Sequence, residues 1–507
     1  MSIQAFHARL SANTTRNRLY PFQRVGVDWM FNRETICDDY GISGGILCDE
    51  MGLGKTIQAL ALIHANPQPP TLIVVPVAVI TQWRDECVAR TGIEPLIVNV
   101  VNLRRASSSS VPNPNYIDID TILQQQIVIA PHSCFNNASI NFNDHALLDA
   151  KFGRVIVDEA HVLKNTKTIT NLYMRQIDAQ FRWCLTGTPV VSTTKDIHAI
   201  MAFLTSGDME MAAQIVEDAL DDTDVSIEGP RMMGIVMRRT NAGVANDSSR
   251  LAPVPAILSL KMLNFAPRER SSYAAMYREG RPALRDDGTL SGSARQQVLV
   301  LILRLRQKSA FAAAKIDALV DAFSFHRPGT RSLIFCNWLQ EVDMVTEALE
   351  SLRVPNIRVM QYHGRMTQPE RTQVVNAFQD RNSRDSMAMV VQIQAGGAAL
   401  NLQAASEVFI MSPNWSASTE MQAIARAHRT ATTHQVSVTR FVMKSSIEEF
   451  IHNRQADKLE TAADVLKDPR LVRALLATDD SESTDWERDV SLFGSDAYDE
   501  IEDVEML

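Results

Sequence analysis

The chain has 507 residues, of which 45% are hydrophobic and 21% charged, and this composition indicates a globular protein of two or three domains. No apolar run reaches the roughly 18 residues that cross a bilayer, and residues 1–10 do not resemble a signal peptide. We therefore expect a soluble intracellular protein that is neither inserted in a membrane nor secreted. It would be nuclear in a eukaryote and otherwise cytoplasmic or associated with a virus.

The net charge of −9 is concentrated in one segment. Residues 479–507 hold twelve acidic residues and one basic residue, Arg488, so the rest of the chain carries a net charge of +2. A nearly neutral body can still present a basic groove to an anionic partner, because local patches matter more than the sum. The six cysteines form no Cys-x-x-Cys pair, which argues against a zinc module or a disulfide framework.

Short apolar runs along the chain predict strands that are buried on both faces of parallel sheets. Helical periodicity in the segments between them, as in residues 56–64 and 370–378, predicts an α/β fold. We expect a first domain over residues 1–240, a helical linker without strands over 241–325, a second domain over 326–478 and a disordered tail over 479–507. The predicted strands are residues 45–48, 72–75, 127–129, 155–157, 333–335, 389–391 and 408–410.

A glycine-rich turn follows the first predicted strand and opens the first predicted helix, as a phosphate-binding loop requires. Its glycines let backbone N–H groups surround phosphate oxygens, Lys55 can neutralise the β- and γ-phosphates of ATP, and the Thr56 hydroxyl can reach Mg²⁺. The generic pattern has glycine where this chain has an aspartate, and a turn without a ligand is the alternative. The predicted ATP-binding residues of the loop are Asp49, Glu50, Met51, Gly52, Leu53, Gly54, Lys55 and Thr56.

Two carboxylates, Asp158 and Glu159, follow the predicted strand at residues 155–157. The carboxyl end of a strand is where sites form in α/β proteins. Asp158 is placed to hold Mg²⁺ together with Thr56, and Glu159 to orient and deprotonate an attacking water. A solvated acidic strand end is the alternative, but a phosphate-binding loop about 100 residues upstream makes a catalytic pair the better interpretation.

The motifs of the first half resemble those of the Swi/Snf-type branch of the helicase-like ATPases. Asp158-Glu-Ala-His-Val-Leu-Lys-Asn165 is similar to a box of that family, and Leu19-Tyr-Pro-Phe-Gln23 to its adenine-recognition segment, which implies that Gln23 contacts the base. Residues 72–76 with Trp83, and residues 185–189, match two further boxes. The resemblance implies two RecA-like domains, a coupling role for His161, Thr186, Gly187 and Thr188, and a nucleic-acid contact at Pro76.

The second half carries a corresponding set of motifs. Residues 333–338, 362–364 and 395–402 are similar to family boxes, and the resemblance implies nucleic-acid contacts at Gly396, Gly397, Asn401 and Trp415. Gln392, Ile393 and Gln394 stand where the family has Ser/Thr and Lys, Ala399 replaces a glycine, and Val190-Val191 replaces a Gln-Asn pair. These departures predict a weakened phosphate contact and altered coupling.

Arg426 and Arg429 are three residues apart in a helical pattern, so we expect them to share one helix face. In the family, such arginines reach the γ-phosphate bound by the other lobe, and a guanidinium suits this role because it is always charged and forks onto phosphate oxygens. Gln422 begins the same segment and is implied in coupling. A solvated helix face is the alternative, and residues 430–433 depart from the family pattern.

The resemblance implies an ATP- and Mg²⁺-dependent translocase that moves along double-stranded DNA and remodels protein–DNA complexes. A superfamily-two RNA or DNA helicase, a transcription-associated nucleic-acid-dependent ATPase and a scaffold without catalysis are the alternatives. The acidic tail either solubilises the protein, or it competes with DNA for a basic groove or binds a basic or DNA-bound protein partner.

Overall fold

The chain folds into two compact units, one built around Met1–Ala252 and the other around Pro253–Asp457. The computed structural model describes residues 3–12, 19–36, 40–103, 113, 115–136, 145–187, 194–221, 229–231, 234–240, 243–244, 256–280, 292–324, 328–351, 357–380, 383, 385–396, 400, 402–428 and 434–466. The acidic tail, and with it the prediction of disorder there, lies outside these residues. No helix in the described ranges combines the length and apolar character needed to cross a membrane.

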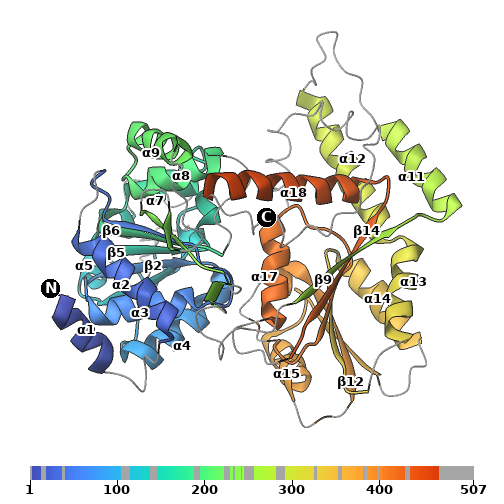
Figure 1. Cartoon of the computed structure of the whole chain (residues 1–507), viewed down its shortest axis with the longest axis horizontal. Coiled ribbons are helices and arrows are strands. Elements are labelled where there is room, and N and C mark those ends of the chain that lie inside the picture. The colour runs from blue at the N-terminus through green and yellow to red at the C-terminus, as the bar shows by residue number, and fades with distance from the viewer. Residues whose placement is uncertain are drawn as a thin grey trace. The chain divides into compact units, whose positions relative to one another are not determined.

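The first unit is built on an eight-stranded sheet in the order β3-β4-β2-β5-β6-β1-β8-β7 (Figure 1). All neighbouring strands are parallel except β7, which runs antiparallel to β8. The strands are β1 (Gly44–Leu47), β2 (Thr71–Val75), β3 (Leu96–Ile97), β4 (Ile127–Pro131), β5 (Lys151–Asp158), β6 (Asp178–Leu185), β7 (Gly229–Arg231) and β8 (Val236–Arg238).

Helices cover both faces of this sheet (Figure 1). One face carries α1 (Ile3–Ala12), α2 (Pro21–Thr35), α3 (Lys55–Ala65) and α4 (Ile80–Thr91), and the other α7 (Ile169–Gln176), α8 (Thr194–Leu204) and α9 (Met209–Asp221). The short helices α5 (Ile119–Leu123) and α6 (Ala146–Asp149) complete the unit. The core between α2, α3, α4 and the sheet contains Trp29 and Trp183, whose rings meet edge to face at 5.4 Å.

The second unit contains a fully parallel six-stranded sheet in the order β11-β12-β10-β13-β14-β9. Successive residues of its central strand enter different cores: Leu333 and Phe335 pack with α15 and α17, whereas Ile334 and Cys336 pack with α13 and α14. This alternation follows from the two-residue period of a strand, and helices on both faces make the buried strands apolar throughout. The strands are β9 (Ile257–Leu263), β10 (Arg331–Cys336), β11 (Ile357–Tyr362), β12 (Ser386–Gln392), β13 (Glu407–Ile410) and β14 (Ser437–Met443).

The helices of the second unit form two groups. Those that flank the sheet are α13 (Ala313–Ser324), α14 (Leu339–Ser351), α15 (Gln368–Gln379), the short α16 (Ile393–Gly396) and α17 (Ala417–Ala427). Three others, α11 (Pro267–Gly280), α12 (Gly292–Ala310) and α18 (Ile447–Leu466), share a separate apolar cluster that includes Tyr273, Leu305 and Ile451.

The two-sheet α/β architecture and all seven predicted strands are confirmed. The prediction of a linker without strands over residues 241–325 was wrong, because β9 falls there, and β7 and β8 just before it were not predicted either. Strand β9 is at the edge of its sheet with most residues exposed or half-exposed, and β7 and β8 have only three residues each. Neither kind of strand produces the buried apolar run on which the prediction relied.

Candidate active site

The predicted motifs of the first unit meet along one edge of its sheet. Because the strands are parallel, the residues that follow their carboxyl ends lie together at this edge. In the order β2-β5-β6-β1-β8 these segments begin with Pro76, the Asp158-Glu159 pair, Thr186, the loop at residues 49–54 and Arg239.

The loop before α3 has the backbone geometry of a phosphate cradle. Gly52 and Gly54 have φ angles of 91° and 81°, which favour glycine, and helix α3 begins at Lys55. A Cβ at Gly54 would also lie 2.6 Å from Nε2 of Gln23, which is too close for a side chain to fit without a shift. The Lys55 ammonium donates to the Asp49 carbonyl at 2.8 Å, and Thr56 stands half-buried in the first turn of the helix. These residues fit a nucleotide phosphate chain.

Gln23 connects helix α2 to this loop. Its Nε2 donates to the Leu53 carbonyl at 2.9 Å, and its Oε1 accepts from the Tyr20 N–H at 3.0 Å. The predicted adenine-binding residue therefore lies directly against the phosphate loop. Contact with the base stays a prediction.

Asp49, the residue that departs from the generic glycine, is fully buried beside Arg239. The Arg239 Nε donates to Asp49 Oδ1 at 2.9 Å, and its Nη2 donates to Oδ2. Gln58 joins them by donating to Asp49 Oδ2 at 2.9 Å and by accepting from Arg239 Nη2 at 2.7 Å. The Glu50 N–H adds a backbone bond to the Arg239 carbonyl at 2.8 Å.

The sequence did not point to Arg239, because the residue lies 190 positions from Asp49 and outside every motif that we recognised. The opposite charges of Asp49 and Arg239 do not reveal the pair in the sequence, because only the fold brings these two residues together. Space supports the pairing as well: a Cβ at Gly26 would lie 2.0 Å from Gln58 Oε1 and 2.5 Å from Arg239 Nη2. Arg239 thus holds the first residue of the phosphate loop in place.

Asp158 ends strand β5, and hydrogen bonds fix its carboxylate. Trp83 Nε1 donates to Oδ2 at 2.8 Å, and the Glu159 N–H donates to Oδ1 at 3.0 Å. Burial, followed by repulsion from Glu159, raises the pKa of Asp158 to about 6. The carboxylate is therefore mostly ionised near pH 7 and held in one orientation, which fits the oxygen ligand that a hard cation such as Mg²⁺ requires.

Glu159 has a φ of 51°, an uncommon backbone conformation for a residue with a side chain. Its Oε2 lies 3.5 Å from Nδ1 of His161, the predicted coupling residue. Behind the pair, the His132 Nε2 lies 2.9 Å from the Asp158 carbonyl oxygen. Burial, reinforced by the neighbouring His161, lowers the pKa of His132 to about 4, so His132 is neutral near pH 7 and donates this bond.

The segment after β6 lies against the phosphate loop. Thr186 is fully buried and donates its N–H to the Leu47 carbonyl at 3.2 Å. A Cβ at Gly187 would lie 2.5 Å from Met51 Cγ and 3.4 Å from Lys55 Nζ, so glycine alone permits this approach. Thr188 lies outside the described residues, and the coupling roles stay predictions.

In the second unit, helix α17 presents Gln422 and Arg426 four residues apart, and therefore on one face. Arg429 lies outside the described residues, so its predicted place beside Arg426 stays a prediction. Among the predicted nucleic-acid contacts, Gly396 ends α16, whereas Gly397 and Asn401 lie outside the described residues. Trp415 is only 5% exposed and packs in the core with the Arg306 guanidinium 5.5 Å from its ring.

Two family models match the chain: the SNF2-related domain over residues 22–310 and the helicase conserved C-terminal domain over residues 314–431. The chain belongs to the SNF2-related family. It is therefore a helicase-like ATPase, and the Swi/Snf-type resemblance of its motifs is confirmed.

Similar SNF2-related proteins include viral and plant sequences. The probable global transactivator of Orgyia pseudotsugata multicapsid polyhedrosis virus is 26% identical, over 87% of this chain and 90% of the viral protein. The DNA repair and recombination protein RAD54 of Oryza sativa is 24% identical over 87% of this chain, which spans 51% of that protein. A SWI2/SNF2 ATPase core of Sulfolobus solfataricus solved with double-stranded DNA is 19% identical, with a TM-score of 0.37. The match covers 92% of this chain and 98% of the Sulfolobus chain.

Proposed function

We propose that this SNF2-related chain is an ATP- and Mg²⁺-dependent translocase on double-stranded DNA that remodels protein–DNA complexes. The observation that carries the proposal is that Lys55, Asp158 and Glu159 all lie at the carboxyl edge of the first sheet. Lys55 follows strand β1, and Asp158 and Glu159 stand at the end of β5, with only β6 between these two strands. Phosphoryl transfer needs mainly positioning and charge neutralisation, and these three side chains supply both.

Each residue has a separate role in this proposal. The Lys55 ammonium neutralises phosphate charge, and the Thr56 hydroxyl and Asp158 carboxylate hold the metal ion. Bound Mg²⁺ would withdraw charge from the phosphate oxygens. Glu159 orients the attacking water and accepts its proton. His161 lies beside the Glu159 carboxylate and helps to hold it in position. Gln23 recognises adenine.

The remaining groups in the proposal come from both units. Arg426 and Arg429 stabilise the γ-phosphate charge, and His161, Thr186, Gly187, Thr188 and Gln422 couple hydrolysis to movement. Pro76, Gly396, Gly397 and Asn401 contribute to the grip on nucleic acid, whereas Trp415 supports it only from the core. A grip on the phosphate backbone is independent of sequence and weakens as salt rises. The half-buried Gln392, whose Oε1 accepts from the Gly364 N–H at 3.2 Å, stands where the family places a phosphate contact.

Double-stranded DNA is the preferred track for two reasons. The long acidic box at residues 158–165 is of the Swi/Snf type, and relatives of this chain include a DNA repair and recombination protein. An RNA or strand-separating helicase is the second candidate. A scaffold without catalysis is disfavoured because the Lys55, Asp158 and Glu159 geometry is intact.

ATP turnover by purified variants tests the site. We expect Lys55→Ala and Glu159→Gln to lower the rate on the order of 10²–10⁴-fold, because each removes a group that acts in the transition state. Lys151→Ala is the control, since Lys151 is an exposed lysine at the opposite end of the strand that carries Asp158. Near-wild-type turnover by either site variant would refute the assignment.

The track is tested by measuring ATPase stimulation with duplex DNA, single-stranded DNA and RNA at matched nucleotide and salt concentrations. Displacement of a DNA-bound triplex-forming strand then reports movement along the duplex. Stimulation by RNA alone would transfer the chain to the second candidate. Stimulation by duplex DNA without triplex displacement would leave a DNA-dependent ATPase that does not translocate.

A further inference from the structure

Two buried arginines of the first unit are each matched by a carboxylate. Arg154 is fully buried and forks onto Glu34, with both Arg154–Glu34 hydrogen bonds at 2.6 Å. Arg239 forks in the same way onto Asp49. Such pairing stabilises a buried arginine, because an unpaired charge loses its hydration on burial and receives nothing in return.

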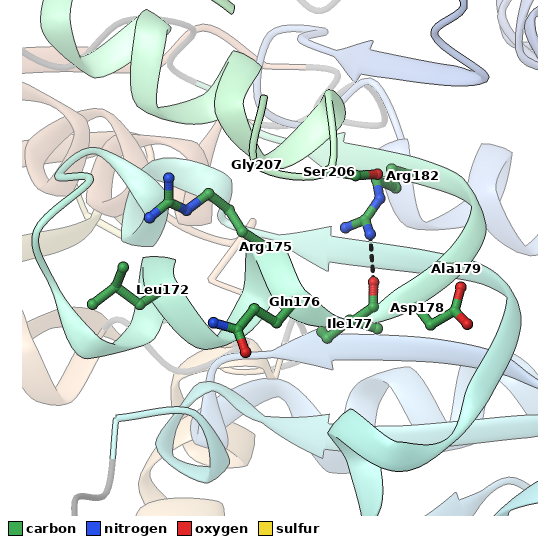
Figure 2. A pocket seen from close by; sticks show the side chains of 9 residues that line it. All are labelled: Leu172, Arg175, Gln176, Ile177, Asp178, Ala179, Arg182, Ser206 and Gly207. Atoms are coloured by element: carbon green, nitrogen blue, oxygen red, sulfur yellow. Dashed lines mark hydrogen bonds between the residues drawn. The ribbon is translucent and has the colours of Figure 1, made fainter. Parts of the chain in front are cut away.

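Arg182, on strand β6, forms no ion pair with a carboxylate among the described residues. Arg182 is only 5% exposed, and its Nη2 donates to the Ile177 carbonyl, a neutral acceptor (Figure 2). Its Nε and Nη1 are buried without a hydrogen-bond partner. The guanidinium also lies 5.2 Å from the centre of the Phe203 ring, which adds attraction but accepts no conventional hydrogen bond.

No anion compensates this charge within the described part of the unit. Asp178 is the carboxylate whose electrostatic attraction stabilises the charged form of Arg182. However, Asp178 is exposed, and its carboxylate lies 3.6 Å from the Lys151 ammonium. Burial dominates and lowers the pKa of Arg182 to about 10, so the side chain still carries its charge near pH 7. A fixed, poorly solvated cation with two unused donors is a preorganised partner for an anion.

A cavity of about 670 Å³ opens beside Arg182 (Figure 2). Its walls are mostly polar and include donors from Arg175, Gln176 and Ser206, while Asp178 is the one carboxylate among its lining residues. The Arg175 Nε is also buried without a partner. In Figure 2 the Arg175 guanidinium extends away from Arg182, so Arg182 is the anchor and Arg175 adds charge at the periphery.

This cavity is separate from the ATP site. Arg182 pairs with Gly44, the first residue of β1, whereas the phosphate loop follows Leu47 at the other end of that strand. Three residues of strand span about 10 Å, so the sheet itself separates the two places. An anion bound beside Arg182 would therefore approach from the amino-terminal edge of the sheet.

We propose that the cavity beside Arg182 binds a phosphate group. A phosphate offers several charged acceptor oxygens to a lining rich in N–H and O–H donors, whereas an apolar ligand would leave those donors unmatched and a neutral ligand would supply no counter-charge. The group could belong to a free phosphate compound or to a nucleic-acid backbone, and the two sources share this chemistry. An occupied site would supply the counter-charge that Arg182 lacks.

Thermal unfolding of the full-length chain, titrated with inorganic phosphate against sodium chloride at equal ionic strength, tests the proposal. The Lys55→Ala background weakens phosphate binding at the ATP site. We expect phosphate to raise the melting temperature by a few degrees in this background and Arg182→Met to abolish that rise. Without phosphate, Arg182→Met should melt at the same temperature or higher, because it replaces an unpaired buried charge by an apolar chain of similar length.

Two further variants guard the result. Arg175→Gln, which changes a less buried residue, should weaken the phosphate response about two- to tenfold, as expected for loss of one peripheral charge. Arg84→Gln removes an exposed arginine paired with Glu94 and should change nothing. A phosphate response that survives Arg182→Met, or no response in the Lys55→Ala protein, overturns the proposal. So does an Arg182→Met protein that is strongly destabilised without phosphate while its response is retained.

Binding of a fluorescent DNA duplex distinguishes the two sources. If Arg182→Met and Arg175→Gln lose the phosphate response but keep wild-type affinity for DNA, the ligand is a free phosphate compound. If both variants also weaken DNA binding several-fold and flatten its salt dependence, the cavity receives a backbone phosphate. Either result supports the site, and failure of the proposed translocase would not affect it.

Discussion

The carboxyl edges of the two sheets are built from similar polar residues but use them differently. At the edge of the first sheet, Lys55, Thr56, Asp158 and Glu159 remain half-buried. At the edge of the second sheet, the residues that follow β10 and β13 are buried, with exposures of 5–7% for Asn337, Ser412 and Asn414.

Charges at the second edge are matched within the protein. The Lys315 Nζ lies 2.5 Å from Glu448 Oε1 and donates to Ser412 Oγ at 2.7 Å. Ser412 in turn donates to Glu341 Oε1 at 3.0 Å, and Glu341 also accepts the Asn337 N–H at 2.8 Å. Burial raises the pKa of Glu341, with Lys315 opposing this shift.

A second part of this network sets the start of helix α17. Glu420 Oε1 accepts the Asn414 N–H at 2.7 Å and Gln455 Nε2 at 2.8 Å, and Glu420 Oε2 pairs with Arg440 at 2.6 Å. The helix that carries Arg426 is thereby fixed to the sheet. The comparison teaches that polar residues at the same edge of a sheet can have two uses. Where they stay half-buried, as in the first unit, they are open to a ligand, and where their charges pair with each other, as in the second unit, they form a rigid support.

The largest expected effect comes from removing the cation of the second edge. In Lys315→Met, Glu448 and Glu341 keep buried carboxylates without their cation, which costs about 3–5 kcal/mol. For a unit of this size the loss lowers the melting temperature of its transition by roughly 10 °C. Differential scanning calorimetry measures this shift.

Lys261→Met, an exposed lysine on strand β9, is the matched control and should melt like the wild type. ATP binding by the Lys315→Met protein below its transition should remain, because the lysine lies outside the first unit. A Lys315→Met protein with unchanged melting would show that the second edge is not held by its charge pairs, and the comparison would fail.

An intermediate effect is expected from pH at the first edge. The Asp158 pKa of about 6 is raised in the folded protein, so its carboxylate is mostly ionised at pH 7 and about one-tenth ionised at pH 5. Since the ionised form is the one that we propose to hold Mg²⁺, we expect Mg²⁺–ATP affinity to fall about tenfold between these pH values at subsaturating Mg²⁺. Isothermal titration calorimetry over this range gives the midpoint.

The Glu159→Gln variant sharpens this measurement, because repulsion by Glu159 contributes to the raised pKa. With that charge removed, the midpoint of the Mg²⁺–ATP binding profile should move below pH 6. A midpoint that stays in place would mean that Glu159 does not act on Asp158 electrostatically. The readout is binding, so loss of turnover in this variant does not obscure it.

Local patterns were sufficient to predict the phosphate loop and seven of the strands, because each depends on neighbouring residues, but β6 in the middle of the first sheet was missed. Strand β10 is fully buried and reads as one apolar run, whereas β11 at the sheet edge alternates between half-exposed and buried residues and escaped prediction. Arg239 escaped for a different reason: its partner Asp49 is 190 residues away. Trp415 shows a third limit, since a motif match predicted a nucleic-acid contact for a ring that packs in the core.

A final effect of similar size is expected from the backbone of the first edge. Gly54→Ala places a Cβ 2.6 Å from Gln23 Nε2 at a φ of 81°, so the loop must shift away from Gln23. We expect about 1–2 kcal/mol of strain, seen as a roughly tenfold weaker ATP affinity in a fluorescent-nucleotide titration. Gly41→Ala is the control, because Gly41 has a similar φ of 69° with nothing within 4 Å of the new Cβ. If both variants bind ATP like the wild type, the contact with Gln23 does not shape the loop. If Gly54→Ala alone is weakened, close packing rather than backbone angle prepares the open edge for its ligand.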